Sequence, residues 1–178
     1  MENSRIITCF VASPGDTLQE REICEKVMRE INTSLGSALG FRLETRKWEK
    51  DVHPSIGTDG QHVINRQIGL DYDIFIGIMY KRFGSPTPRA GSGTEEEFDR
   101  ALALHEKHPE VEIMFYFNRE ATDLDQIDYE QFGKVNAFRE KVRKAGCLTW
   151  DYKGPEAFEG CLRKHLLMRL TEICKPHV

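Results

Sequence analysis

The sequence predicts an α/β protein in which a doubly wound, parallel sheet of five strands, in the order 2-1-3-4-5, lies between two layers of helices. Two observations support this prediction. Five short apolar runs alternate with longer segments whose apolar residues recur at helical spacing, and strands that alternate with helices pair in parallel. Two of the runs, 5–12 and 73–80, are apolar almost throughout, which is typical of parallel strands covered on both faces.

The expected strands are 5–12, 41–48, 73–80, 111–117 and 147–150. The first suits a strand covered on both faces, and the third suits a central position because its apolar run is unbroken. The second alternates apolar and charged residues in its first half, as a half-buried strand near a sheet edge does. The fourth is apolar and aromatic, and the fifth is a short run that follows Gly146.

The expected helices lie at 17–35, around 63–68, at 94–107, around 132–142 and at 158–173. Each carries apolar residues at helical spacing, as an amphipathic helix does. The Pro and Gly of segment 13–16 end the first strand, and Ser13 or Asp16 can cap the helix that follows. That helix is expected to end near Gly36.

The composition is that of one globular domain. The chain has 178 residues, 39% of them apolar and 30% charged, and residues 1–178 are expected to form a single domain. The last expected helix ends a few residues before Val178, which is compatible with the N-terminal domain of a longer protein. The net charge of −4 argues against binding nucleic acid through a basic surface. No apolar run approaches the roughly 20 residues of a membrane span, so we expect a cytoplasmic protein without membrane contact.

The cysteines and histidines give no reason to expect a metal. Five cysteines are widely spaced, with no Cys-x-x-Cys pair, and this pattern favours reduced, buried thiols. His105 and His108 lie three residues apart, but a metal site needs further ligands at compatible positions. We therefore expect neither a metal nor a resident cofactor.

The segment 91–98, Gly-Ser-Gly-Thr-Glu-Glu-Glu-Phe, ends a loop rich in Gly, Pro and Arg and begins a helix. In a doubly wound sheet the ligand crevice opens at the carboxyl ends of the strands, where the strand order reverses, here between the first and third strands. The loops expected to meet there are 13–16, 80–94 and the segment after Trp48. Polar loops distant in sequence should therefore converge on one crevice.

Glu97 has two explanations that the residues alone leave open. It can be a carboxylate of a ligand site in this crevice. Alternatively, Thr94-x-x-Glu97 has the spacing of a capping box, in which Thr94 caps the helix and Glu97 reaches back to it. Glu95 and Glu96 lie where the helix dipole favours anions. A capping box does not, however, explain the long loop before the helix.

Other residues near the crevice also have two explanations. The candidate binding residues are Ser13, Pro14, Gly15, Asp16, Trp48, Arg82, Phe83, Ser92, Gly93 and Thr94. The segment 13–16 can present N–H groups to a phosphate or can be an ordinary capped turn. Arg82, with Lys81 and Arg89, offers cations that are otherwise merely solvated. Trp48 and Phe83 can stack on a base or pyridine ring or can pack in the core.

Motifs spread over nearly the whole chain match one family in combination. They are Cys9-Phe10-Val11-Ala12-Ser13-Pro14-Gly15-Asp16, Arg46-Lys47-Trp48-Glu49, Asp71-Tyr72-Asp73-Ile74-Phe75-Ile76-Gly77, Arg82-Phe83-Gly84-Ser85-Pro86-Thr87 and Ser92-Gly93-Thr94-Glu95-Glu96-Glu97-Phe98. The chain thereby resembles an uncharacterised TIR-like domain family, often found at the N-terminus of large STAND-type, NACHT-like NTPases of prokaryotic defence and signalling proteins. This resemblance implies a TIR-like, flavodoxin-like fold, self-association, and STAND NTPase and sensor regions in the same polypeptide.

More distantly, Ser92-Gly93-Thr94-x-x-Glu97 with Ala101 looks like the nucleophile motif of nucleoside 2-deoxyribosyltransferases, which TIR domains resemble in fold. The catalytic glutamate of that family then falls on Glu97. The transferase acid expected at the end of the third strand is replaced by Met79-Tyr80, and the aspartate before Ser-Gly-Thr is replaced by Gly91. These departures argue against deoxyribosyl transfer and leave simple hydrolysis of an N-glycosidic bond open; a nucleoside deoxyribosyltransferase or hydrolase is a further alternative.

Together, these resemblances imply that the substrate is NAD or a related nucleotide and that its N-glycosidic bond is cleaved. Glu97 would stabilise or trap the positive charge on C1′, while Ser92 and Thr94 orient the ribose and 13–15 lies near a phosphate. Nicotinamide in NAD is already cationic, so no general acid is required. The alternative is a non-catalytic TIR-like module that binds a nucleotide or partner protein and signals by oligomerisation. A receiver domain is set aside because Met79-Tyr80 occupies the phosphoacceptor position.

Overall fold

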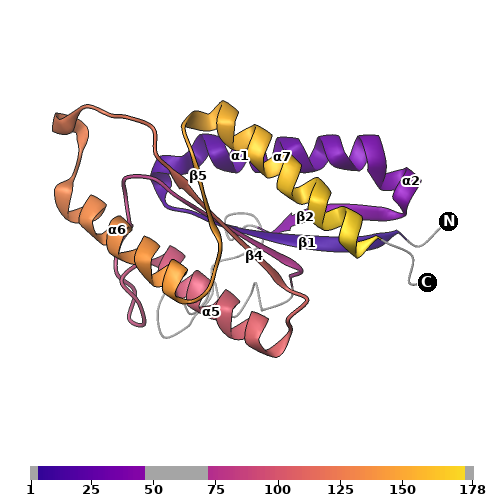
Figure 1. Cartoon of the computed structure of the whole chain (residues 1–178), viewed down its shortest axis with the longest axis horizontal. Coiled ribbons are helices and arrows are strands. Elements are labelled where there is room, and N and C mark those ends of the chain that lie inside the picture. Colours follow the sequence, from indigo (N-terminus) through magenta and orange to yellow (C-terminus); the bar gives the residue numbers. More distant parts are fainter. Residues whose placement is uncertain (1–3, 47–71, 175–178) are drawn as a thin grey trace, which may run out of the picture.

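The computed structural model describes residues 4–46 and 72–174. Their strands form one parallel five-stranded sheet in the order β2-β1-β3-β4-β5 (Figure 1). The strands are β1 (Arg5–Ala12), β2 (Phe41–Arg46), β3 (Ile74–Met79), β4 (Glu112–Asn118) and β5 (Thr149–Tyr152). The predicted fold class and strand order are confirmed, and the arrangement is flavodoxin-like.

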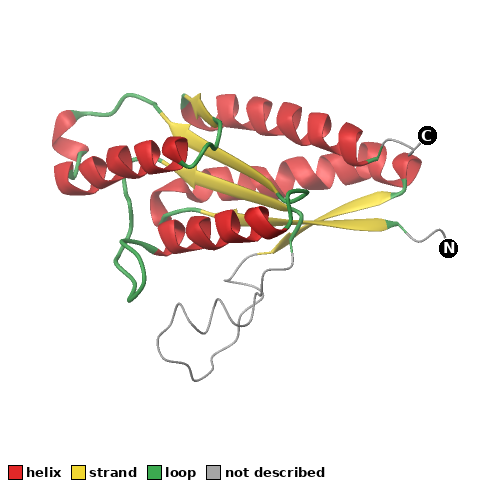
Figure 2. Cartoon of the chain, turned by 60° about the horizontal axis from the view of Figure 1, so that its bottom comes forward, coloured by secondary structure: helices red, strands yellow, loops and turns green. Residues whose placement is uncertain are grey.

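Helices cover both faces of this sheet (Figures 1 and 2). The helical elements are η1 (Gly15–Thr17), α1 (Leu18–Ile31), η2 (Asn32–Gly36), α2 (Ser37–Leu39), α5 (Gly93–Lys107), η3 (Leu124–Gln126), α6 (Tyr129–Lys144) and α7 (Gly154–Ile173). α1 and α7 pack on one face, whereas α5 and α6 pack on the other. Because β1 leads into α1 and β3 leads into α5, the chain reverses direction across the sheet between β1 and β3, as the sequence predicts.

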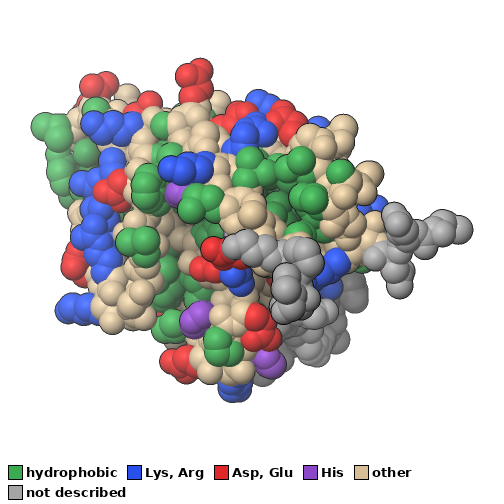
Figure 3. Space-filling model, turned by 45° about the vertical axis from the view of Figure 1, so that its right-hand side comes forward, with side chains coloured by type: hydrophobic (Ala, Val, Ile, Leu, Met, Phe, Trp, Pro, Cys, Tyr) green, Lys and Arg blue, Asp and Glu red, His purple; other side chains and the backbone are tan. Residues whose placement is uncertain are grey.

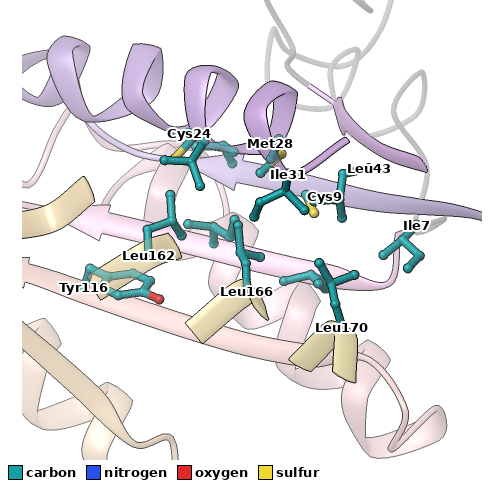
Figure 4. Packing of buried hydrophobic residues seen from close by; sticks show 14 of the residues in the cluster. Ile7, Cys9, Cys24, Met28, Ile31, Leu43, Tyr116, Leu162, Leu166 and Leu170 are labelled. Carbon is teal, nitrogen blue, oxygen red and sulfur yellow. The ribbon is translucent and has the colours of Figure 1, made fainter. Parts of the chain in front are cut away.

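An aliphatic cluster joins α1 and α7 to the sheet. In Figure 4, Cys24 and Ile31 of α1 face Leu162 and Leu166 of α7, and Cys9 of β1 lies next to Ile31. All five side chains are almost completely buried. Burial raises the pKa of the Cys9 thiol well above its usual range, and Asp73 adds to this shift. Cys9 is therefore an inert core residue, as the sequence predicts for the buried thiols.

An aromatic cluster fills the opposite face. The ring of Phe115 on β4 lies edge-on to Phe98 of α5 and Phe138 of α6, at centroid distances of 5.8 and 5.5 Å. Such edge-to-face pairs add to the stabilisation from burial. Phe98 directly follows the three glutamates of α5, so this cluster fixes the position of the helix that carries them.

Several element boundaries differ from the prediction by one to four residues, and two of the differences have a backbone cause. The first helix continues past Gly36 through a π-helical turn and ends at Gly40, which has a φ of 67°. Only glycine adopts this left-handed conformation without strain. The fifth strand begins at Thr149 rather than two residues earlier, because Gly146, with a φ of 84°, follows the end of α6 and the chain needs two further residues to reach the sheet.

Two predictions lie outside the described residues, and the remaining ones concern membrane spans and metal ligands. Trp48 and the helix expected around 63–68 lie outside the described residues. Among the helices that the structure describes, none has the length and apolar character needed to cross a bilayer. Within residues 4–46 and 72–174, no three His, Cys, Asp or Glu side chains are grouped so that they could hold a metal ion. His105 donates its ring N–H to the Val111 carbonyl, with 2.7 Å between the two atoms.

Candidate functional site

Ser92 caps the N-terminus of α5, since its hydroxyl accepts a hydrogen bond from the Glu95 N–H at 3.1 Å. Glu95 reaches back, and its carboxylate accepts a hydrogen bond from the Gly91 N–H at 2.7 Å. This resembles a capping box that lies two residues before the predicted one. The predicted box is therefore wrong: Thr94 is the second residue of α5, and Glu97 lies about one turn inside the helix.

The packing around Glu95 shows why the cap forms there. Lys141 of α6 donates to the second carboxylate oxygen of Glu95 at 2.9 Å. A Cβ at Gly91 would lie 2.8 Å from the Phe83 ring and 2.9 Å from the Glu95 carboxylate, so the tight turn requires glycine. Glu95 is thereby committed to the cap and to the contact between α5 and α6.

Glu96 anchors the long loop that precedes α5. Its carboxylate is buried and accepts hydrogen bonds from the Arg89 guanidinium and the Thr87 hydroxyl, both at 2.6 Å. Charge-assisted bonds of this kind are short and strong. The loop rich in Gly, Pro and Arg is thus held by the second glutamate, and Arg89 is a partner of Glu96 rather than merely solvated.

Replacing Glu96 with glutamine is expected to lower the free energy of unfolding by about 1–3 kcal/mol, because one buried, charge-assisted anchor of the loop is lost. Asp99→Asn is the matched control, since it removes a carboxylate of the same helix whose ion pair with Lys141 is exposed. That change should cost at most about 1 kcal/mol. Urea denaturation measures both. Equal effects of the two substitutions would contradict the anchoring role of Glu96.

Glu97 is the third glutamate, and it lies in a different environment. Its side chain is buried, and its electrostatic neighbours include Tyr72 and Arg100. Tyr72 stacks on Phe10 of β1 at a centroid distance of 5.5 Å, so these groups lie beside β1 on the face that α5 covers. The carboxylate therefore lies on the face of the β1–β3 pair, between which the strand order reverses, and its neighbour Tyr72 comes from the amino end of β3.

The neighbours of Glu97 show its electrostatic influence. Burial raises the pKa of the Tyr72 phenol well above its usual range; the Arg100 guanidinium opposes this shift and the Glu97 carboxylate adds to it. Burial lowers the pKa of Arg100, while Tyr72, Glu96 and Glu97 act in the opposite direction. Arg100 lies three residues after Glu97 on the helix, so the guanidinium and this carboxylate attract each other.

Thr94 shares a helix face with Glu97, because residues three apart are neighbours on a helix surface. It is largely buried, and its hydroxyl makes no hydrogen bond within the part of the chain that the structure describes. Ser92 is also buried, but its hydroxyl is used by the cap. Of the two hydroxyls predicted to orient a ligand, the structure thus leaves that of Thr94 available.

The segment 13–16 is tied to its surroundings by its own side chains. The Asp16 carboxylate accepts hydrogen bonds from the backbone N–H groups of Lys81 and Arg82, both at 3.0 Å. The predicted convergence of this segment with the loop after β3 is confirmed. Asp16 itself braces the two loops through one carboxylate oxygen, and its role in ligand binding stays a prediction.

Arg21 of α1 holds the rest of this segment. Its guanidinium donates to the hydroxyl and the carbonyl of Ser13, both at 2.6 Å, and to the carbonyl of Pro14 at 3.3 Å. Ser13 therefore serves the turn, and its prediction as a ligand-binding hydroxyl is not favoured. Gly15 remains exposed at the start of η1, where backbone N–H groups lack intrahelical partners.

The loop after β3 divides into a buried and an exposed part. Phe83 is buried and packs on Phe138 at a centroid distance of 5.7 Å, so its ring belongs to the core rather than to a stacking surface. Its N–H and that of Gly84 donate to the Gln131 side chain of α6. The Arg82 side chain is exposed and has no ion pair within the described residues, which leaves a cation at the carboxyl end of β3.

Residues 8–167 match the model of a domain of unknown function, DUF4062. The chain belongs to the DUF4062 family. Curated proteins give no match. Among solved structures, the chain is similar to a conserved protein from Enterococcus faecalis V583, with 13% identity and a TM-score of 0.47, over 92% of this chain and 99% of that one.

Several residues that build the site of this DUF4062 domain were not predicted. Tyr72 precedes β3 and Arg100 lies within α5; Tyr72 belongs to one of the family motifs, but neither residue was predicted to take part in the site. The spacing of Arg100 three residues after Glu97 is the one pattern that could have identified it. Gln131 could not be predicted, because its contact with the loop after β3 spans more than 40 residues of sequence.

Glu20 is a further buried carboxylate in this DUF4062 domain, and it lies on the opposite face of the sheet from Glu96 and Glu97. It accepts hydrogen bonds from the Tyr152 hydroxyl at 2.9 Å and the Asn118 amide at 3.3 Å. Burial and then Glu20 raise the pKa of the Tyr152 phenol. Since α1 carries Glu20 and the other two residues end β4 and β5, this group joins α1 to the carboxyl ends of the strands.

Proposed function

We propose that this DUF4062 domain cleaves the N-glycosidic bond of NAD or a related nucleotide, with Glu97 as the catalytic carboxylate. The supporting observation is the separation of the three glutamates of α5. Glu95 serves the helix cap and Glu96 anchors a loop, whereas Glu97 is buried on the face of β1 and β3, the two strands between which the strand order reverses. Open α/β sheets bind ligands at that point. Helix capping, which competed with catalysis as an explanation of Glu97, no longer applies.

The proposed reaction is hydrolysis at C1′ of the nicotinamide ribose. The bond between C1′ and the pyridinium nitrogen breaks, and nicotinamide leaves as a neutral molecule with the bonding electron pair. The positive charge that develops on C1′ and the ring oxygen is stabilised by the Glu97 carboxylate. Water then adds to C1′ and releases a proton, giving ADP-ribose. The leaving group needs no protonation, so one carboxylate suffices.

Other residues of the crevice have supporting roles in this proposal. The Thr94 hydroxyl, on the same helix face as Glu97, donates to or accepts from a ribose hydroxyl. Arg100 interacts electrostatically with the Glu97 carboxylate and would help to hold it in position. Arg82 and the exposed backbone at Gly15 lie on the loops braced by Asp16 and contact the phosphates. Ser92 has no substrate role here because it caps α5.

The biological setting follows from the resemblance to TIR-like domains. We propose a cytoplasmic protein of prokaryotic defence or signalling, in which STAND NTPase and sensor regions in the same polypeptide bring copies of this domain together. Self-association then controls the cleavage of the nucleotide ligand. Because such control would leave an isolated domain weakly active, activity should be measured in the assembled state.

The experiment is to incubate the domain with NAD, both dilute and fused to a helical peptide that forms a defined oligomer, and to follow nicotinamide by chromatography. Nicotinamide and ADP-ribose in equal amounts are expected, at a higher rate per domain in the oligomer. Binding of NAD by calorimetry without release of nicotinamide in either state would favour the non-catalytic nucleotide-binding module. If NAD is neither bound nor cleaved in either state, the assignment of NAD as the ligand is contradicted.

A further inference from the structure

A cavity of about 600 Å³ lies at the other side of the molecule, between the start of β4, the connection from α6 to β5, and α7. Figure 3 shows hydrophobic side chains gathered around a hollowed surface that charged side chains border. β5 pairs with Phe115–Asn118, so among the described residues no strand lies beside the first three residues of β4 on this side. The short fifth strand thus leaves the sheet edge open and forms one wall of the cavity.

The cavity is predominantly apolar, and several of its apolar groups are unusually exposed. Leu148 is 86% exposed, Met168 57% and Trp150 42%. These three are among the eight large hydrophobic side chains classed as exposed in residues 4–46 and 72–174. Clustered exposure of this kind marks an interaction site more often than scattered single residues do. A volume of this size is in the range of small-molecule sites.

One end of the cavity is aromatic. The His165 ring lies edge-on to Trp150 at a centroid distance of 4.9 Å and accepts or donates a hydrogen bond with the Tyr116 hydroxyl at 2.9 Å. Burial, and then the nearby Lys164 ammonium, lower the pKa of His165. The imidazole is therefore mostly neutral at pH 7, and it forms part of an aromatic wall beside a lysine.

The two ends of the cavity differ in the charge of the side chains that line them. Lys164, Met168 and Glu172 line the cavity at intervals of four residues and so share one face of α7, with the first and last about 12 Å apart. At the far end Arg169 pairs with Glu172 at 3.1 Å and with Glu112 at 3.3 Å. Lys164 has no ion pair within the described ranges. The uncompensated positive charge thus lies at the aromatic end, away from the carboxylates.

From this arrangement we infer that the cavity is a second ligand site, which takes a small aromatic anion with its ring between Trp150 and the open edge of β4 and its anionic group at Lys164. The site lies near the amino-terminal start of β4, whereas the proposed nucleotide crevice opens at the carboxyl ends of the strands. It is therefore independent of the proposed NAD cleavage.

The probe is 1-anilinonaphthalene-8-sulfonate, an aromatic sulfonate, compared with N-phenyl-1-naphthylamine, which has the same rings and no charge. Binding is followed by probe fluorescence, and amide chemical shifts in the ¹⁵N-labelled protein locate the site. Shifts are expected to concentrate at Ile113–Phe115 and Leu148–Trp150. Lys164→Met should weaken binding of the sulfonate two- to fivefold, about the effect of one exposed ion pair, and leave the neutral probe unchanged.

Lys153→Met is the control, because it removes the same charge from an exposed residue that does not line the cavity. It should leave both affinities unchanged. Equal weakening by Lys153→Met and Lys164→Met would show a general charge effect and overturn the role of Lys164. Shifts located elsewhere, or no binding of either probe to the folded wild-type protein, would overturn the site.

Discussion

Glu97→Gln is expected to lower the rate of nicotinamide release from NAD by about a hundredfold to a thousandfold, the usual cost of removing one group that stabilises transition-state charge. The substitution keeps the size of the side chain and removes its charge, so the transition state loses its anionic partner. The effect should appear in kcat, with a smaller change in KM, because a group that acts mainly in the transition state contributes little to substrate binding.

The other two glutamates of α5 provide matched controls. Glu95→Gln and Glu96→Gln remove the same charge from the same helix, but at side chains that bond the protein itself. Both substitutions should change the melting temperature. They should have a smaller effect on the rate of nicotinamide release, measured well below that temperature. Comparable loss of activity in all three variants at equal folded fraction would contradict the assignment of Glu97. Full activity of Glu97→Gln would remove this residue from the mechanism.

Gly77→Ala should have a large effect on stability. Gly77 lies in β3, and a Cβ there would overlap ring atoms of Phe115 on the neighbouring strand. Phe115 cannot easily move, because Phe75, Phe98, Phe117 and Phe138 surround it. Overpacking of a filled core costs about 1–3 kcal/mol, and we expect the upper end of this range. Thermal or urea unfolding measures the loss.

A second substitution tests the cause of this loss. Phe115→Leu should be less harmful in the Gly77→Ala background than in the wild type, since the smaller side chain relieves the overlap, and the coupling should be about 0.5–3 kcal/mol. Gly133→Ala is the control, because Gly133 lies within α6 with open space around it. It should be neutral or stabilise by up to about 1 kcal/mol. Additive effects of Gly77→Ala and Phe115→Leu would refute the proposed overlap.

The sheet could be predicted from the sequence because its central strands are nearly continuous runs of apolar residues. β3 and the second half of β1 are covered on both faces, so almost every position there is apolar, and this pattern differs from that of the helices. The boundaries were harder to predict. Gly36 and Gly40 are both reasonable helix ends in the sequence, and the choice depends on a π-helical turn that places Gly36 against the Phe41 carbonyl.

The candidate site shows where local patterns stop being sufficient. Ser92-x-x-Glu95 and Thr94-x-x-Glu97 have the same spacing, so either could be the capping box. The choice is made by contacts from other elements, such as Lys141 of α6 bonding Glu95. Asp16 likewise bonds amides 65 and 66 residues away, and no local pattern reveals such a contact.

The central claim is that Glu97 faces the ribose of a bound nucleotide. The most direct measurement is a crystal structure of the Glu97→Gln protein soaked with NAD, in which hydrolysis is slowed. The claim predicts the nicotinamide ribose beside the start of α5, with the side chain at position 97 within hydrogen-bonding distance of the ribose, about 2.6–3.2 Å. A nucleotide bound elsewhere, or a side chain at position 97 that contacts only Tyr72 and Arg100, would contradict it.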